Sequence, residues 1–240
     1  MSGPSVSEPT VPPEGPVWLY LHGFASGPLS TKGRAFQAWG ASQGIAIEAL
    51  DLRVPTFEQL RFSAIKARVR AAIDASSPSA PERARAVLIG SSLGGLTACR
   101  VAEEDARVCA VFAMAPAFRL VERWRSQLGA AAWEAWRRDG MLEVDDYATK
   151  RKAKVDFGFV DELEGLDVGW PDVRVPVTIV HGRQDTVVDI DRSRAFAAGR
   201  RHVRLVEVDD GHELGASIPR ILAEAGAFFG SLRGPIDTMR

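Results

Sequence analysis

AVLIGSSLGG, residues 86–95, joins an apolar β-rich run to a Gly-x-Ser-x-Gly pentad, after which small and apolar residues continue. A strand, a sharp turn and a helix in this order are typical of a nucleophile elbow, which holds a serine hydroxyl above the end of a parallel sheet. Gly90 and Gly94 fit because side chains there would collide with the neighbouring strand and helix. The register selects Ser92, since a pentad centred on Ser91 would need glycines where isoleucine and leucine stand.

Size and charge narrow the possible classes of protein. With 240 residues, one α/β domain with a substantial core is expected. The formal net charge of −1 gives no electrostatic reason to expect nucleic acid or an anionic membrane as a partner. No apolar stretch approaches the ~18 residues of a transmembrane helix. No cysteine and histidine cluster has the spacing of a zinc site, and we expect no metal and no other cofactor.

The first sixteen residues differ from the rest of the chain. They are rich in Pro, Ser, Glu and Gly and lack the basic start and apolar middle of a signal peptide. This composition predicts a disordered tail, residues 1–16, on a cytoplasmic protein, followed by one domain at residues 17–240.

Short β-rich runs alternate with helical patterns along that domain. We expect strands at residues 17–21, 45–50, 86–90, 108–114, 175–180 and 203–208. We expect helices at residues 30–41, about 57–75, 93–104 and 218–232. This alternation predicts the α/β class, with a mostly parallel sheet of about six strands and helices on both faces.

One segment breaks this alternation between the fourth and fifth strands. It is much longer than a single crossover helix requires, and it combines many charges with Trp124, Trp133, Trp136, Met141, Tyr147, Phe157, Phe159 and Trp170. Ligands of open α/β folds bind at the carboxyl edge of the sheet. We therefore expect an inserted helical cap, about residues 118–172, over that edge. The alternative is a set of surface helices whose aromatic residues belong to the core.

A serine hydroxyl needs a base, and the base needs an orienting group. Asp185 closes the run His-Gly-Arg-Gln-Asp directly after the fifth strand, and His212 closes Asp-Asp-Gly-His after the sixth. Serine, acid and histidine follow one another in the chain order expected of a triad built around such a nucleophile elbow. We therefore predict Ser92 as the nucleophile, Asp185 as the acid and His212 as the base.

Other residues compete for the two supporting roles. We interpret His22 as a residue that stabilises a turn, His181 as structural and His202 as solvated. The other acids that we considered are Asp51, Asp189, Asp191, Asp209 and Asp210. Asp51 follows the second strand and is an outside candidate. Asp189 and Asp191 lie further into the loop than Asp185, and Asp209 and Asp210 have the character of turn residues.

An acyl-transfer site also needs donors for an oxyanion. Two backbone N–H groups are expected, one from Leu93 after the nucleophile and one from Phe24 in the loop after the first strand. The Leu93 amide lies at a helix N-terminus, where the dipole favours negative charge. The Phe24 side chain can belong to the core. The glycines near residues 23–27 match no phosphate-binding pattern, so nucleotide binding has no support.

At about residues 17–232 the chain resembles the α/β-hydrolase superfamily. Within it, LYLHGF (residues 19–24), the following Ser26, Pro28, Ser30 and Lys32, and GSSLGG (residues 90–95) resemble the small bacterial esterases of the YqiA/YcfP-like group. This resemblance implies a carboxylic-ester or thioester hydrolase and implies the same triad and oxyanion donors. The chain departs from the pattern in lacking the first two strands of the eight-stranded fold and in its segment at about residues 118–172.

The expected function is a cofactor-free serine hydrolase that cleaves small-molecule esters or thioesters of small to medium acyl groups through an acyl-enzyme on Ser92. An acyltransferase or a carbon–carbon bond hydrolase would use the same triad. A non-catalytic interaction protein that uses the surface of the insertion is the alternative from another class.

Overall fold

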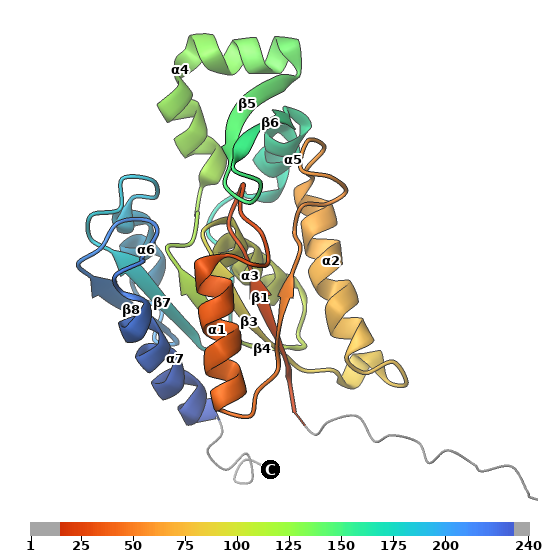
Figure 1. Ribbon diagram of the computed structural model, residues 1–240, viewed down its shortest axis with the longest axis vertical. Helices are drawn as coiled ribbons and strands as arrows, with labels where there is room; N and C mark the ends of the chain where they lie inside the picture. The colour runs from red at the N-terminus through yellow and green to blue at the C-terminus, as the bar shows by residue number, and fades with distance from the viewer. Residues whose placement is uncertain (1–14, 233–240) are drawn as a thin grey trace, which may run out of the picture.

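Six strands form one sheet in the order β2-β1-β3-β4-β7-β8 in the computed structural model, which describes residues 15–232 (Figure 1). They are β1 (Val17–Leu21), β2 (Ile47–Leu50), β3 (Ala86–Ser91), β4 (Val108–Met114), β7 (Val177–Gly182) and β8 (Val203–Val208). Every neighbouring pair is parallel, so all six carboxyl ends meet at one edge of the sheet. The predicted α/β class is confirmed. The predicted tail, residues 1–16, lies outside the described residues except for its last two positions.

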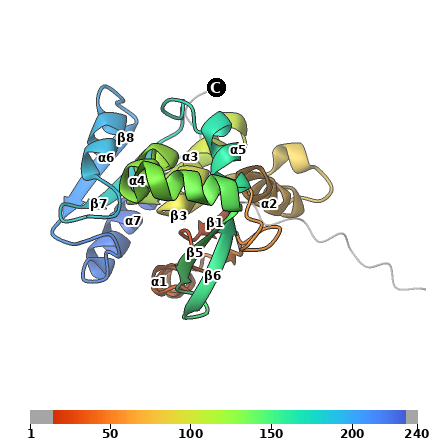
Figure 2. The ribbon, with the colours of Figure 1, turned by 90° about the horizontal axis from the view of Figure 1, so that it is seen from above.

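Helices cover both faces of this sheet (Figure 2). One face carries α1 (Thr31–Ser42) and α7 (Ile218–Leu232). The other carries α2 (Phe62–Ala75), α3 (Leu93–Glu104) and α6 (Ile190–Ala197), and the short helix η1 (Pro81–Arg83) follows α2. Both faces of the parallel sheet are therefore buried, as its continuous apolar strands predict.

The alternation of side chains along β1 divides the interior into two cores. Trp18 and Tyr20 belong to the core beneath α1 and α7, and Leu19 and Leu21 belong to the core beneath α2 and α3. Successive side chains of a strand point to opposite faces, so one apolar strand supplies both cores.

One helix starts later than its apolar pattern predicts. The apolar positions from residue 57 onward predict a helix, but α2 begins only at Phe62. Phe57 and Leu60 are buried within a loop instead, and Arg61 has extended backbone angles, φ −138° and ψ 130°. The apolar pattern therefore extends to buried loop residues that precede the first residue of α2.

The insertion between β4 and β7 lies beyond the carboxyl edge of the sheet (Figure 1). It consists of α4 (Leu120–Asp139), which is broken at Gly129, β5 (Met141–Asp146), β6 (Arg151–Asp156) and α5 (Gly158–Leu166). We call these four elements the insertion. The sequence predicted helices here, and the antiparallel hairpin of β5 and β6 is an addition to that expectation.

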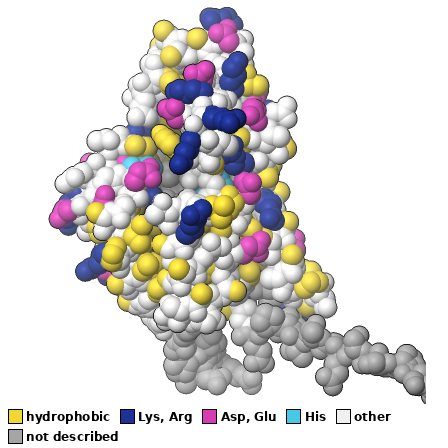
Figure 3. All heavy atoms as spheres, viewed as in Figure 1, with side chains coloured by type: hydrophobic (Ala, Val, Ile, Leu, Met, Phe, Trp, Pro, Cys, Tyr) yellow, Lys and Arg dark blue, Asp and Glu magenta, His cyan; other side chains and the backbone are white. Residues whose placement is uncertain are grey.

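The hairpin escaped prediction because its apolar positions are few: on β5 only Leu142 and Val144 alternate with exposed residues, and on β6 only Ala153 and Val155 do so. Charged pairs stand between its apolar ones: Glu143 lies opposite Lys154, and Asp145 lies opposite Lys152. Figure 3 shows the resulting mixture of basic and acidic side chains over the insertion. Among the helices of residues 15–232, none has the length and apolar character needed to cross a membrane.

Candidate active site

Ser92 occupies the turn between β3 and α3. Its backbone angles, φ 53° and ψ −115°, are ones that residues with a side chain rarely adopt. The two glycines of the pentad make this turn sterically possible. A Cβ on Gly90 would lie 2.7 Å from the Gly95 Cα, and a Cβ on Gly94 would lie 2.7 Å from the His22 carbonyl oxygen. No side chain fits at either position, so the elbow brings α3 directly against the end of β1.

The structure brings Ser92, His212 and Asp185 into one chain of contacts. The His212 Nε2 lies 3.1 Å from the Ser92 Oγ, and the His212 Nδ1 lies 2.7 Å from the Asp185 Oδ2. The His212 side chain is 12% exposed, and the Asp185 side chain is fully buried. A serine hydroxyl in this arrangement can donate to an imidazole whose other nitrogen donates to a carboxylate.

The acid and the histidine meet because the loops after β7 and β8 are joined. A Cβ on Gly182 would lie 2.7 Å from the Gly211 carbonyl oxygen, so only glycine allows this approach. The Gln184 N–H donates to the Asp210 carbonyl at 3.0 Å. The Asp210 carboxylate in turn accepts the Ser217 N–H at 2.9 Å, which closes the loop that carries His212.

Asp185 is saturated with hydrogen bonds. Its Oδ1 accepts the N–H groups of Val187 and Val188, each at 2.7 Å, and its Oδ2 accepts from His212 and His181. Burial by itself would raise the pKa of Asp185, but these hydrogen bonds outweigh it and hold the pKa well below its usual range. The carboxylate therefore stays ionised and can fix the orientation of His212.

His181 shares this carboxylate, which the sequence analysis missed. Its Nε2 lies 3.1 Å from the Asp185 Oδ2 and 3.0 Å from the Val188 carbonyl oxygen, and its Nδ1 lies 2.8 Å from the Ser193 Oγ. Since Nε2 faces two acceptors, we assign the proton to it and an acceptor role to Nδ1. The available signal was the spacing of four residues between His181, near the end of β7, and Asp185 in the loop that follows.

The loop after β1 lies beside the serine. A Cβ on Gly23 would lie 3.3 Å from the Ser92 Cβ. Within residues 15–232, neither the Phe24 N–H nor the Leu93 N–H has a hydrogen-bond acceptor. Leu93 is the first residue of α3, where a helix leaves its N–H groups unpaired. Two free donors of this kind, one on each side of the serine, can receive a developing oxyanion.

The Phe24 side chain packs against the insertion. Its ring meets Trp124 of α4 edge-on at 4.8 Å and stacks on Phe159 of α5 at 6.1 Å between centroids. Phe57, from the loop before α2, lies 5.4 Å away. The predicted oxyanion loop and the insertion thus share one aromatic cluster.

The competing histidines lie elsewhere. The His22 Nδ1 donates to the Gly23 carbonyl at 2.8 Å, and its Nε2 accepts the Leu52 N–H at 3.0 Å. Burial lowers the pKa of His22, which keeps it neutral in this role in the turn. His202 is exposed, and its Nε2 donates to the Val173 carbonyl at 2.7 Å.

The competing acids have other partners. Asp51 lies 3.6 Å from His22, and Asp189 caps α6 by accepting the Asp191 N–H at 2.9 Å. The contacts of the others are Asp191 with Arg194 at 2.8 Å, Asp209 with Arg183 at 2.6 Å and Asp210 with Ser217 at 2.9 Å. Among residues 15–232, no group of three or more His, Cys, Asp and Glu side chains is arranged to hold a metal ion.

Comparisons with known proteins agree with this architecture. A sequence model of the Uncharacterised protein family (UPF0227) matches residues 17–230. The comparison with curated proteins gives no significant match. Solved structures with the same fold are those of α/β-hydrolase domain-containing protein 10 from mouse, Est1E from Butyrivibrio proteoclasticus and esterase Pf2001 from Pyrococcus furiosus.

Their likeness lies in the fold. The mouse protein is 20% identical, with a TM-score of 0.75 and 90% of each chain covered. Est1E is 21% identical, with a TM-score of 0.71 and coverage of 90% of this chain and 87% of that one. The Pyrococcus esterase is 17% identical, with a TM-score of 0.64 and coverage of 90% and 82%. The described residues therefore have the α/β-hydrolase fold.

Proposed function

The chain belongs to the uncharacterised protein family UPF0227, of the YcfP/YqiA-like type, and from this premise we propose that it is a serine hydrolase of carboxylic esters or thioesters with small to medium acyl groups. The observation that carries the proposal is the contact chain from Ser92 through His212 to Asp185, with distances of 3.1 Å and 2.7 Å. The protein from Pyrococcus furiosus that shares this fold is an esterase, which adds support.

The reaction follows from the position of each group. His212 takes the proton of Ser92 as the hydroxyl oxygen attacks the acyl carbonyl, and Asp185 stabilises the imidazolium that forms. The N–H groups of Phe24 and Leu93 donate to the oxyanion of the tetrahedral intermediate. His212 then protonates the departing alcohol or thiol. Water, deprotonated by His212, releases the acid from the serine and restores the free enzyme.

A fluorophosphonate probe tests the nucleophile directly. We expect covalent labelling of the full-length protein, with the added mass on the peptide that contains Ser92, because an activated serine attacks the electrophilic phosphorus. A folded protein that takes no label would contradict the proposal and would favour the interaction protein. Esters and thioesters of increasing acyl length, offered with and without a competing alcohol, then separate a hydrolase from an acyltransferase by their products.

Asparagine in place of Asp185 should lower kcat by about 10⁴-fold, as loss of the orienting charge does in other triads. The expected cause is specific to this site, because both carboxylate oxygens of Asp185 accept hydrogen bonds. The NH₂ group of an asparagine would face N–H donors at one of these two positions. Steady-state hydrolysis of p-nitrophenyl butyrate measures the loss.

Asp189→Asn is the matched control. Asp189 caps α6 from the same loop, and asparagine caps helices equally well. We expect this variant to keep wild-type kcat. If Asp185→Asn kept kcat within about tenfold of wild type, another group would have to orient His212.

A further inference from the structure

The tip of the hairpin in the insertion rests on the loop that carries Phe24. The Ala148 N–H is shared between the Ala25 carbonyl oxygen at 3.2 Å and the Asp146 Oδ1 at 3.0 Å. A Cβ on Gly27 would touch the Ala148 Cβ at 3.5 Å. Ala25 directly follows Phe24 and has φ 55°, a conformation that needs support from its surroundings. That support comes in part from the hairpin.

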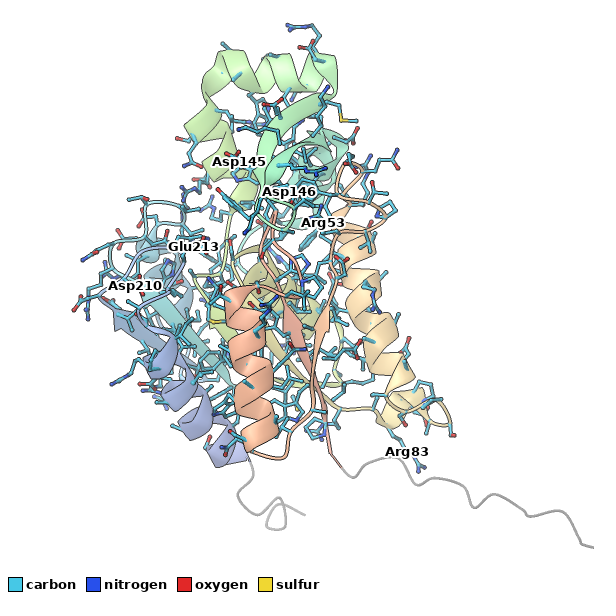
Figure 4. All side chains as sticks on the ribbon, viewed as in Figure 1. Arg53, Arg83, Asp145, Asp146, Asp210 and Glu213 are labelled. Carbon is cyan, nitrogen blue, oxygen red and sulfur yellow. The ribbon has the colours of Figure 1, made fainter. Side chains whose placement is uncertain are left out.

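An ion pair between a partly exposed arginine and a buried carboxylate holds the tip in this place. Arg53, from the loop after β2, forms two parallel hydrogen bonds to Asp146, each 2.8 Å long. Figure 4 shows the two side chains pointing toward each other at the junction of the hairpin and the body. The Asp146 side chain is 2% exposed, and its Oδ2 also accepts the Thr149 hydroxyl at 2.8 Å. A bidentate pair of this kind fixes geometry as well as charge.

The same arginine reaches the aromatic cluster around Phe24. Its guanidinium lies 4.6 Å from the centroid of the Phe57 ring, which packs on the ring of Phe24. The hydrogen bonds from Arg53 lower the pKa of Asp146 to about 2, so the pair keeps both charges at neutral pH. Two routes therefore lead from Arg53 to the predicted oxyanion loop: one runs through Asp146 and Ala148 to Ala25, and the other through Phe57.

We propose that Arg53 and Asp146 are positioning residues, which clamp the hairpin tip onto the loop after β1 and so aim the Phe24 N–H at the oxyanion. This inference rests on the proposed function. An oxyanion donor is worth about 10²–10³ in kcat, and a displacement of about 1 Å can cost as much as 10²-fold. The insertion would then contribute to the chemical step as well as cover the site.

A second ion pair on the same hairpin provides a matched control. Arg61 and Asp156 join the far end of β6 to the start of α2 at 2.7 Å. That pair also ties the insertion to the body, but it lies at the opposite end of the hairpin from Ala148. Loss of either pair loosens the insertion, whereas only loss of the Arg53–Asp146 pair should release the Phe24 loop.

The test compares Asp146→Asn with Asp156→Asn in the full-length protein. For Asp146→Asn we expect kcat toward p-nitrophenyl butyrate to fall by about 10–100-fold, with KM within about threefold of wild type. Affinity for a trifluoromethyl ketone, which forms a tetrahedral adduct on the serine, should fall by the same factor. Asp156→Asn should change kcat and this affinity by less than about threefold.

Amide hydrogen exchange gives a readout that does not depend on activity. In Asp146→Asn, the peptide that contains residues 23–27 should exchange faster than in wild type, and in Asp156→Asn it should not. Thr149→Val removes only the hydroxyl contact to Asp146, and it should give a smaller change of the same kind if Asp146→Asn proves too unstable to assay.

The outcomes separate the two proposals. Equal effects of Asp146→Asn and Asp156→Asn on kcat, or no effect of either in folded protein, would overturn the positioning role while the hydrolase stands. If the wild-type protein neither hydrolyses esters nor takes the fluorophosphonate label, the proposed function is refuted. Faster exchange of residues 23–27 in Asp146→Asn would then show a structural contact without a catalytic role.

Discussion

Ser92→Ala is expected to lower kcat for p-nitrophenyl butyrate by about 10⁶-fold, the loss seen when a triad serine is removed from other hydrolases. The variant keeps the Cβ and loses only the Oγ, which in the structure lies 3.1 Å from the His212 Nε2. No other hydroxyl contacts His212 among the described residues, so no substitute nucleophile is in place. Residual turnover would come from water held near the oxyanion donors. Initial rates at high enzyme concentration and the loss of fluorophosphonate labelling measure the effect.

Ser91→Ala provides the control, because it makes the same substitution one residue earlier. Ser91 is the last residue of β3 and is 5% exposed, whereas Ser92 lies in the turn. We expect Ser91→Ala to keep kcat within about threefold of wild type. If the two variants exchanged their effects, the motif would be centred one residue earlier and the proposed mechanism would fail with it.

The candidate site residues could be predicted from the sequence because each follows an apolar strand. The carboxyl ends of parallel strands share one edge of the sheet, so a serine, an aspartate and a histidine after β3, β7 and β8 are brought near one another by topology alone. The run of apolar residues defines each strand, and the polar residue after it marks the edge. This reasoning needs no information about side-chain packing, which is why it reached the three residues that the structure joins.

The contacts around these residues could not be predicted from the sequence. Arg53 and Asp146 are separated by 93 positions, and no local pattern connects a loop after β2 with the end of a hairpin strand. The hairpin alternates only two apolar residues on each strand among charged ones, which is too short a pattern to identify a strand. His181 was interpreted as structural, and only its distance from Asp185 shows that two imidazoles share one carboxylate. Pairings of this kind depend on tertiary structure rather than on sequence period.

Gly94→Ala is expected to cost about 4 kcal/mol or more in the free energy of unfolding, or to prevent folding. A methyl group there would overlap the Leu21 carbonyl group and lie 2.7 Å from the His22 carbonyl oxygen. Both neighbours are backbone atoms at the end of β1, so neither can turn aside as a flexible side chain could. The helix α3 would have to move away from the sheet. Urea unfolding, followed by circular dichroism, measures the change.

Gly226→Ala is the contrast that isolates this steric cause. Gly226 lies within α7, and the nearest atom to its added Cβ, on the Trp39 ring, is 4.0 Å away. Alanine should therefore stabilise the protein by roughly 0.5–1 kcal/mol, since it favours the helix. A similar loss in both variants would show that helix packing in general, rather than the elbow, is sensitive.

The contact at Gly94 also brings the start of α3, with the Leu93 N–H, against the loop that carries the Phe24 N–H. Any Gly94→Ala protein that does fold should consequently lose kcat as well, because the two oxyanion donors would be separated.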